Sequence, residues 1–403
     1  MIIKSQRILR ILAQWSLVLA VFGGIQPAVM AAETAIIDPK SRFHPVHGRS
    51  GMVASQEIVA SRVGADILSQ GGNAIDAAVA TGFALAVTLP RAGNLAGGGF
   101  MMVHLAEENK TIALDYREMA PAAASRDMFL KSNGDVDNQL ARDSLQSSGV
   151  PGTVAGLLYA HEKYGQLTLK QIIQPAIDLA AEGIAVNVDL SSSIKSRAKR
   201  LKRDPSTRRY FFKEDGTFYE LGDKFVQSDL AGSLRRISAN GRSGFYQGKT
   251  AQLITDQMKH SGGLISLDDL KNYRVVERPP VCADFKANKI CAMPPPSSGG
   301  IHLLQMLNIL EPWDLKALGH NSAAYIHRLV EVMRRAYADR SAYLGDPDFY
   351  LVPVSQIIDK KYAKALRRQI DLKQASSSVD VLPGLPIDPD TLIKGAQTAI
   401  AES

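Results

Sequence analysis

Two features within residues 90–121 have the residue types and spacing to do chemistry: a run of three glycines and an arginine near a predicted strand end. Gly97, Gly98 and Gly99 lack a Cβ atom, so the backbone there can take a positive φ or let another backbone or a ligand approach closely. Arg117 precedes Met119-Ala120-Pro121, which stiffens the chain. A guanidinium held in this way can bind a carboxylate through two parallel hydrogen bonds.

Arg117 also has a plainer interpretation, because most charged residues are exposed and paired at the surface. Asp115, Glu118 or a distant acid could be its partner, and its position alone favours this pairing. The flanking pattern predicts strands at residues 100–105 and 111–116, joined by a polar hairpin loop. The glycines follow a predicted helix and open a strand, which is the reverse of a nucleotide-binding loop.

Helices must hold this hairpin in place. The first is predicted at residues 52–69, ending at Gly71-Gly72. Asn73 and Asp76 form a capping-box pattern before a second, alanine-rich helix at 74–87, whose small side chains indicate a covered inner helix. Further predicted helices lie at 153–163, 171–181, 228–240, 249–260, 301–310, 322–343 and 356–370, and a further strand at 273–277.

The helix at 322–343 has the strongest helical periodicity. Its predicted inward stripe consists of Ile326, Leu329, Val330, Met333 and Tyr337. The charged residues predicted to lie elsewhere on the wheel are Arg328, Glu331, Arg335 and Asp339. At its end, salt bridges are a better interpretation than a cation site for the group Asp339, Arg340, Asp346 and Asp348.

A stiff segment, Pro294 to Gly300, opens the helix at 301–310. The first amides of that helix could receive an anion. A rigid strand-to-helix corner is the preferred interpretation, because the prolines and glycines are explained by turn chemistry.

The N-terminus has the layout of a secretory signal peptide: Lys4, Arg7 and Arg10, an apolar run, and small residues up to an expected cleavage after Ala31. A membrane anchor is the alternative, but the apolar run is shorter than the roughly 20 residues that a spanning helix needs. Cleavage removes three of the 47 basic residues and none of the 40 acidic ones, so the net charge falls from +7 to +4. No stable membrane insertion is expected, and the predicted location is the periplasm.

Cys282 and Cys291 are the whole cysteine complement of the chain. They flank two short extended segments that could pair around a turn near Lys286-Ala287, with the cysteines facing each other. An oxidising periplasm permits a disulfide, but the sequence leaves open whether one forms. Neither cysteine has the surroundings of a metal site.

A basic segment could bind nucleic acid or anionic lipid. We favour a solvated helix face or loop and no nucleic-acid partner, because no base-reading motif accompanies the cluster. Its members are Lys195, Arg197, Lys199, Arg200, Lys202, Arg203, Arg208 and Arg209.

Seven motifs, in this order, resemble the large subunit of bacterial gamma-glutamyltranspeptidases over roughly residues 44–370. They are GMVAS at 51–55, GGNAIDAAVA at 71–80, GNLAGGGFM at 93–101, DYREMAP at 115–121, PGTVAG at 151–156, MPPPSSGG at 293–300 and YADRSAYLGDPDF at 337–349.

The resemblance implies an α+β fold of the N-terminal-nucleophile (Ntn) hydrolase type, a four-layer αββα sandwich of which this chain would supply the large-subunit half. In that family a precursor (zymogen) cuts itself, and the new N-terminal Thr of the small subunit attacks the γ-glutamyl carbonyl. Glutathione or another γ-glutamyl compound is the donor, and amino acids, dipeptides or water accept the acyl group. Neither metal nor organic cofactor is implied. Arg117 matches the arginine that holds the α-carboxylate of the glutamyl group, which reverses the plainer interpretation above.

The family's Thr-Thr-His-like nucleophile segment does not occur here, and neither Thr391 nor Thr398 is followed by the expected sequence. No catalytic residue is therefore assigned within this chain, and its partner would be a small subunit carrying the Thr. The expected organisation is a signal peptide at 1–31, a tether at 32–50, the large-subunit core at 51–375, and a mobile tail at 376–403 leading to the self-cleavage site. Two alternatives remain: a related N-acyl amidase like the cephalosporin acylases, or an inactive, truncated scaffold half.

Overall fold

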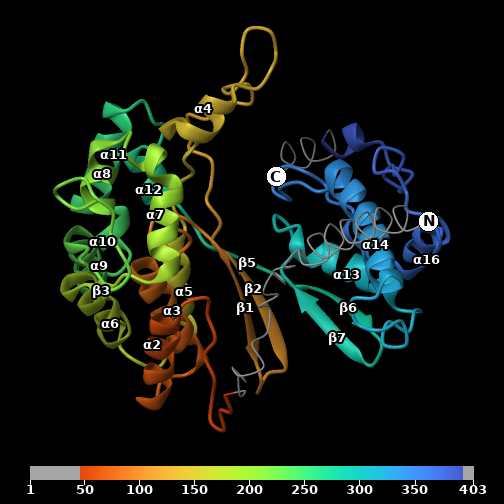
Figure 1. The fold of residues 1–403 in the computed structure, drawn as a ribbon, viewed down its shortest axis with the longest axis horizontal. Helices are drawn as coiled ribbons and strands as arrows, with labels where there is room; N and C mark the ends of the chain where they lie inside the picture. The colour runs from red at the N-terminus through yellow and green to blue at the C-terminus, as the bar shows by residue number, and fades with distance from the viewer. Residues whose placement is uncertain (1–45, 394–403) are drawn as a thin grey trace, which may run out of the picture. The chain divides into compact units, whose positions relative to one another are not determined.

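A computed structural model describes residues 46–393, and the predicted signal peptide and most of the tether lie outside the described residues. The chain divides into two compact units between Ser50 and Gly51, and described residues 51–393 belong to the second unit. This unit mixes helices with three small antiparallel sheets, which confirms the predicted α+β class (Figure 1). Among the described residues, no helix is both long and apolar enough to cross a membrane.

The helices and strands are, in chain order, α2 (Ile58–Ser69), α3 (Ala74–Thr88), β1 (Phe100–Leu105), β2 (Lys110–Asp115), α4 (Asn138–Asp143), η1 (Leu145–Ser147), α5 (Thr153–Tyr164), α6 (Leu169–Glu182), β3 (Ile184–Ala185), α7 (Val188–Leu201), α8 (Pro205–Phe211), β4 (Lys224–Phe225), α9 (Ser228–Asn240), α10 (Ser243–Tyr246), α11 (Gly248–His260), α12 (Leu267–Asn272), β5 (Val276–Arg278), β6 (Val281–Phe285), β7 (Asn288–Ala292), α13 (Gly299–Leu310), α14 (Ala323–Tyr343), α15 (Val354–Ile357) and α16 (Lys360–Arg368).

The largest sheet has the strand order β1-β2-β5, and both pairings are antiparallel. Strand β1 matches its predicted bounds. Strand β2 begins and ends one residue earlier than predicted, and Tyr116 continues the ladder through two backbone hydrogen bonds with Gly99, of 3.1 and 3.2 Å. The third strand is displaced from residues 273–277 to Val276–Arg278.

Helix α3 is the inner helix of the layer that packs on this sheet. Asn73 and Asp76 form the predicted capping box, and the alanine-rich helix is buried along most of its length. It packs against α2, α5 and α6, and its side chains share one apolar core with Val103 and Leu114 of the sheet. Burial at this density is the main stabilising contribution in such a fold.

The glycine run serves a close approach between backbones. The carbonyl oxygen of Gly97 accepts hydrogen bonds from the amides of Gly152 and Thr153, at 2.7 and 2.9 Å. A Cβ atom on Gly98 would lie 2.7 Å from the carbonyl oxygen of Tyr116. None of the three glycines has a positive φ, so the missing side chains, and not an unusual backbone, explain the run.

Several predicted helix boundaries shift because a capping side chain lies inside the predicted range. The first helix begins at Ile58 and not at residue 52, because the Glu57 carboxylate caps it by accepting from the Ala60 amide at 2.8 Å. The helix predicted at 356–370 is two helices, α15 and α16, since Asp359 caps the second one. An N-cap side chain has this effect because it satisfies amides that have no intrahelical partner.

Helix α14 begins one residue later than predicted and ends at the predicted residue, but its predicted inward face is wrong at four of five positions. Ile326, Val330, Met333 and Tyr337 are exposed by 46, 38, 38 and 51%. Three charged residues that were predicted to lie away from the core are buried instead: Glu331, Arg335 and Asp339. Of the predicted stripe, Leu329 is partly buried against an apolar cluster. The helical period was correct, but the face that packs inward combines the three charged residues with the apolar residues Val332 and Ala336.

The buried charges of α14 are compensated by neighbouring side chains and by the C-terminal segment. Glu331 forms an ion pair with Arg335 at 2.8 Å and accepts hydrogen bonds from the hydroxyl and amide of Ser376. Burial alone would raise the pKa of Glu331, but hydrogen bonds from Ser376 and Arg335 outweigh it and hold that pKa below its usual value. Asp339 accepts from Gln305, from the Tyr362 hydroxyl and from the Gly384 amide. The charges therefore anchor residues 376–384 to the helix.

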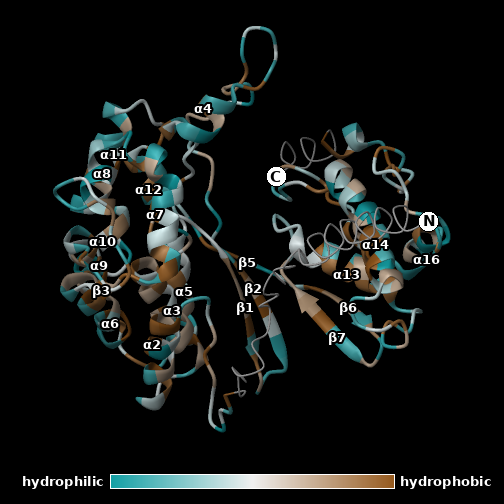
Figure 2. Cartoon of the chain, in the orientation of Figure 1, coloured by the Kyte–Doolittle hydropathy of each residue, from teal (hydrophilic) through white to brown (hydrophobic). Residues whose placement is uncertain are grey.

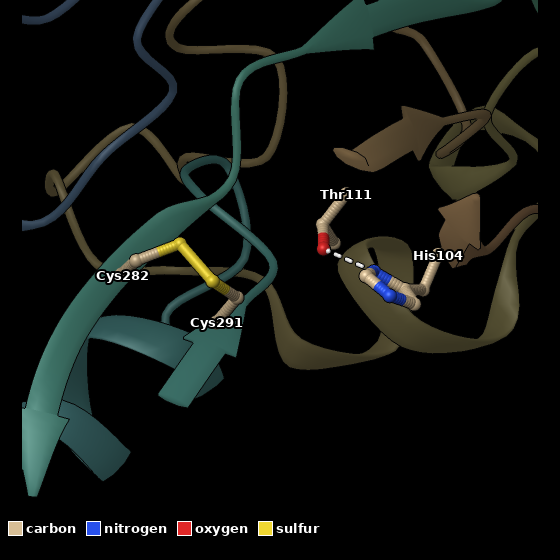
Figure 3. Close-up of a disulfide and its surroundings, with 4 residues drawn as sticks. All are labelled: His104, Thr111, Cys282 and Cys291. Atoms are coloured by element: carbon tan, nitrogen blue, oxygen red, sulfur yellow. Dashed lines mark hydrogen bonds between the residues drawn. A yellow bond between two sulfur atoms is a disulfide. The ribbon is translucent and has the colours of Figure 1, made fainter. Parts of the chain in front are cut away.

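The cysteine hairpin has the predicted register, with Cys282 directly opposite Cys291 and the turn at Lys286, whose φ is +53°. The two cysteines form a disulfide (Figure 3). The hydrophilic colour in Figure 2 marks the turn end of β6 and β7, and the hydrophobic colour marks their other end.

Figure 3 also shows a hydrogen bond between the side chains of His104 and Thr111, which joins β1 and β2 at 3.0 Å.

The basic segment forms α7 and α8 and lies on an exposed face, as predicted. Its side chains form ion pairs with acids from other elements, among them Lys195 with Glu220 at 2.6 Å and Arg200 with Asp143 at 2.7 Å. Exposed pairs of this kind contribute little to stability, about 0–1 kcal/mol each.

We predict opposite effects for alanine at two helical glycines. In α5, a Cβ atom on Gly156 would lie 2.1 Å from Cγ of the buried Tyr116 ring. Gly156→Ala should therefore lower the free energy of unfolding by about 1–3 kcal/mol or more. In α9, a Cβ atom on Gly232 would meet only an arginine nitrogen, at 3.6 Å. Gly232→Ala should raise the free energy of unfolding by about 0.4–1 kcal/mol. Urea denaturation of both variants is the test, and a gain in stability for Gly156→Ala would contradict the close packing described here.

Candidate functional site

The backbone of Arg117 is fixed from two sides. Its amide donates to the Asp115 carboxylate at 3.1 Å, and its carbonyl oxygen accepts from the Tyr273 hydroxyl at 2.8 Å. Two residues later, Met119 pairs with Val150 in an isolated β-bridge. The backbone of Arg117 therefore holds the base of the side chain in a defined position just beyond the end of β2.

The carboxylate of Asp115 is bound by Arg278 and not by the Arg117 side chain. Arg278 of β5 contacts Asp115 at 2.9 Å and also makes two hydrogen bonds to Asp348, at 3.1 and 3.0 Å. Burial lowers the pKa of Arg278, but hydrogen bonds to these two carboxylates more than offset it and hold the pKa above its usual value. Asp115 is 7% exposed, so this ion pair is largely shielded from water.

The guanidinium of Arg117 makes no ion pair with any described residue. Its side-chain contact is a long hydrogen bond from Nη1 to the carbonyl oxygen of Pro296, at 3.4 Å. The pairing with Asp115, Glu118 or a distant acid that the sequence left open is therefore not formed among the described residues. The Arg117 side chain is exposed and able to bind an anion from outside the chain.

Arg117 lies in a pocket of about 680 Å³ where three parts of the fold meet. These parts are the open end of the β1–β2 pair, the start of α13 and the C-terminal end of α14. None of the residues that line the pocket is acidic. They are Phe100, Arg117, Pro296, Ser297, Ser298, Tyr337, Arg340, Ser341, Leu344 and Gly345.

The proline-rich segment forms the predicted strand-to-helix corner. Helix α13 begins at Gly299, two residues earlier than predicted, and Ser298 occupies its N-cap without a capping hydrogen bond. A Cβ atom on Gly300 would lie 2.2 Å from the carbonyl oxygen of Met293, so the corner requires a glycine there. Because Ser297 and Ser298 line the pocket, the positive end of the helix dipole lies at the same site as Arg117.

His302, in the first turn of α13, is a buried histidine that the sequence did not single out. It is 6% exposed and stacks on Tyr337, with ring centroids 5.7 Å apart. Its Nε2 atom has no hydrogen-bond partner among the described residues. Burial, together with the charge of Arg340, lowers the pKa of His302 to about 4.

The salt bridges predicted at the end of α14 form only in part. Asp348 does form one, but with Arg278 of β5. Asp339 is buried among hydrogen-bond donors, and Arg340 makes no ion pair with any described residue and lines the pocket instead. The sequence analysis did not predict these pairings, because the partners come from segments far apart in the chain.

Of the two threonines near the C-terminus, the one that the structure describes, Thr391, does not contribute to this pocket. The Thr391 hydroxyl donates to the carbonyl oxygen of Asp388 at 2.6 Å, and Thr391 does not line the pocket. Thr398 lies outside the described residues.

Comparisons with known proteins find similar sequences over most of the chain. The family model described as Gamma-glutamyltranspeptidase matches residues 60–399. The Glutathione hydrolase proenzyme of Escherichia coli (strain K12) is 47% identical over 342 residues, which are 85% of this chain and 59% of that protein. The Acylase ACY 1 proenzyme of Pseudomonas sp. (strain SE83) is 40% identical over 346 residues, which are 84% of this chain and 62% of that protein. The chain thus spans about 60% of the length of these curated relatives.

Solved structures agree with the predicted Ntn-hydrolase fold. The gamma-glutamyltranspeptidase of Helicobacter pylori superposes with a TM-score of 0.83 at 46% identity, covering 85% of this chain and 98% of that chain. A cephalosporin acylase from Bacillus halodurans gives a TM-score of 0.74 at 27% identity, covering 85% of this chain and 65% of that chain. The predicted fold is confirmed.

We predict that the buried imidazole of His302 makes stability fall on acidification. In the unfolded chain a histidine titrates near ~6.5, whereas the folded pKa is about 4. The unfolded state therefore binds more protons between these values. The stabilisation is complete above pH ~6.5 and is lost as the pH falls toward about 4, on the order of 3 kcal/mol in all.

Urea unfolding at pH 7.5 and pH 4.5 tests this prediction. His302→Phe, which keeps the ring stack and removes the titrating group, should lose less stability between the two pH values than the wild type does. The exposed His104→Gln variant controls for the loss of a histidine. Equal losses in wild type and His302→Phe would contradict the assignment.

Proposed function

We propose the following function for this chain, which belongs to the gamma-glutamyltranspeptidase family. The chain is the large subunit of a gamma-glutamyl acyltransferase and hydrolase. The complete enzyme cleaves glutathione and other γ-glutamyl compounds and passes the γ-glutamyl group to an amino acid, a dipeptide or water. The named relatives are proenzymes of which this chain spans about 60%, which supports a second, small subunit as its partner.

The observation that carries the proposal is the environment of the Arg117 side chain. Its guanidinium lies in a pocket without acidic residues, and the carboxylate of Asp115, two residues earlier in the chain, is bound by Arg278. A guanidinium can bind a carboxylate through two parallel hydrogen bonds, so this pocket suits the α-carboxylate of a glutamyl group.

In the proposed reaction this chain orients the donor and the partner supplies the nucleophile. The hydroxyl oxygen of the partner's N-terminal Thr bonds to the γ-carbonyl carbon of the donor, and its proton passes by way of the threonine's α-amine to the departing amine. An α-amine titrates near ~7.7–8.0, so it can act as the base without a histidine. Attack by an acceptor amine or by water on the acyl-enzyme then releases the threonine.

The proposed compartment is the periplasm. Residues 1–31 are read as a signal peptide, and this assignment rests on the sequence pattern alone. The Cys282–Cys291 disulfide supports it, because such bonds persist in oxidising compartments.

The partner subunit is proposed to cover the exposed apolar stripe of α14. Four apolar residues of that helix face outward, and Leu382 next to them is 73% exposed. Val330, Met333 and Leu382 line one surface pocket, so the stripe is a concave and apolar surface. Apolar patches of this kind mark interaction sites, and the missing part of the proenzyme is the natural occupant.

We predict that Arg117→Lys strongly weakens donor binding in the assembled enzyme. Lysine keeps the charge but cannot form two parallel hydrogen bonds to one carboxylate. Complete loss of one partner of a desolvated ion pair costs about 3–5 kcal/mol, which corresponds to about two to four orders of magnitude in affinity. Because lysine keeps the charge, the Michaelis constant for a γ-glutamyl donor should rise by at most about two orders of magnitude. Arg368→Gln on the exposed face of α16 is a control. An unchanged Michaelis constant in Arg117→Lys would exclude the assigned role.

Competition by free glutamate separates this function from that of a related acylase. Glutamate carries the α-carboxylate that Arg117 is proposed to bind, and it should compete with a γ-glutamyl anilide in the wild type but much less in Arg117→Lys. Turnover of an N-acyl substrate that glutamate does not inhibit would favour the acylase.

We predict that Met333→Glu, at the centre of the apolar stripe, weakens association of the two subunits at least tenfold. A carboxylate buried at an interface without a partner is strongly unfavourable. Leu253→Glu is the matched control, since Leu253 is 56% exposed on α11, away from the stripe. The readout is the polypeptide that co-purifies, identified by intact mass and N-terminal sequencing. A second chain beginning with Thr is expected from the wild type, and equal recovery from both variants would exclude the stripe as the docking surface.

A further inference from the structure

The pocket contains a second guanidinium that the α-carboxylate of a glutamyl group would not use. Arg340, in the last turn of α14, lines the pocket together with Arg117. Its described side-chain contact is with the Tyr337 ring, whose centroid lies 5.7 Å from the guanidinium carbon. The positive charge of Arg340 also helps to lower the pKa of the neighbouring His302.

The acids close to Arg340 in sequence are all bound to other groups. Asp339 accepts from Gln305, Tyr362 and the Gly384 amide. Asp348 is held by Arg278, and Asp346 accepts from the Asp348 amide at 3.0 Å. Within the described part of the chain, Arg340 is therefore a cation whose nearby carboxylates are engaged elsewhere.

A ligand with one carboxylate would leave this pocket with excess positive charge. Two guanidiniums and the N-terminal end of α13 face it, and no acidic side chain lines it. Ser297, Ser298 and Ser341 add hydroxyl groups to the same walls. Electrostatic complementarity therefore favours a ligand with two separate carboxylates.

We propose that Arg340 binds a second carboxylate of the donor, carried by the amine that leaves. The pocket then selects γ-glutamyl donors whose leaving group is itself an acid, as the glycine carboxylate of glutathione is. This inference rests on the function proposed above, with Arg117 on the α-carboxylate. It assigns Arg340 to substrate choice and not to bond cleavage.

The selectivity has a direct kinetic signature. Glutathione carries the second carboxylate, its glycine ethyl ester does not, and γ-glutamyl-p-nitroanilide has a neutral leaving group. Loss of Arg340 should affect the first donor alone. A hydrogen-bonded charge at an open site falls at the lower end of the range for charged partners, which corresponds to about a tenfold change in affinity.

The experiment compares these three donors in the complete processed enzyme. In Arg340→Gln, kcat/KM for glutathione should fall about tenfold, and kcat/KM for the ester and the anilide should change less than twofold. Arg340→Lys, which keeps the charge, should retain part of the preference for glutathione over its ester. Arg368→Gln, an exposed arginine of α16 outside the pocket, should match the wild type with all three donors.

Each other outcome overturns the inference in a recognisable way. An equal fall with all three donors, or loss of the small subunit, would assign Arg340 to folding or to an acid of the partner. An unchanged kcat/KM for glutathione in Arg340→Gln would show that Arg340 does not bind the second carboxylate. A wild-type enzyme that turns over none of the three donors would refute the proposed function itself, and the role of Arg340 with it.

Discussion

The ion pair between Arg278 and Asp115 is the interaction on which the candidate site depends. Arg278 binds Asp115 at the end of β2 and Asp348 in the turn after α14, and so connects two walls of the pocket. It also occupies the carboxylate that stands two residues before Arg117. An unpaired Asp115 would be available to bind the Arg117 guanidinium in place of a ligand. A charge pair that is 14% and 8% exposed at its two side chains is costly to break from one side only, since the remaining charge stays buried.

The features that the sequence predicted well are those decided by neighbours in the chain. The capping box at Asn73 and Asp76, the Gly71 helix stop and the facing cysteines each depend on a few adjacent residues. The role of Arg117 was assigned through its motif and stays a prediction. The choice of Asp115 by Arg278 was not accessible, because it joins residues 163 positions apart. A local sequence pattern does not predict which of several distant groups will pair with a given carboxylate.

Helix α14 shows a second limit of pattern reasoning. Periodicity reports that one side of a helix is apolar, but it does not say what covers that side. Here the polar side packs inward because Ser376, Tyr362 and Gly384 supply donors to its carboxylates. The apolar side faces outward in the described chain. Periodicity therefore identified the helix correctly, but it could not identify which of its faces packs against the rest of the described chain.

Tyr337 and Ser341 belong both to the pocket that holds Arg117 and to the apolar pocket beside Leu382. Two surfaces that share side chains on one helix are thermodynamically linked. If a ligand in the first pocket prefers one rotamer of Tyr337, it changes the affinity of a partner for the second surface, and by reciprocity that partner changes the affinity of the ligand by the same factor. In the proposed two-subunit enzyme, donor binding and subunit association would then be coupled, and the affinity between the two subunits would vary with the concentration of the donor.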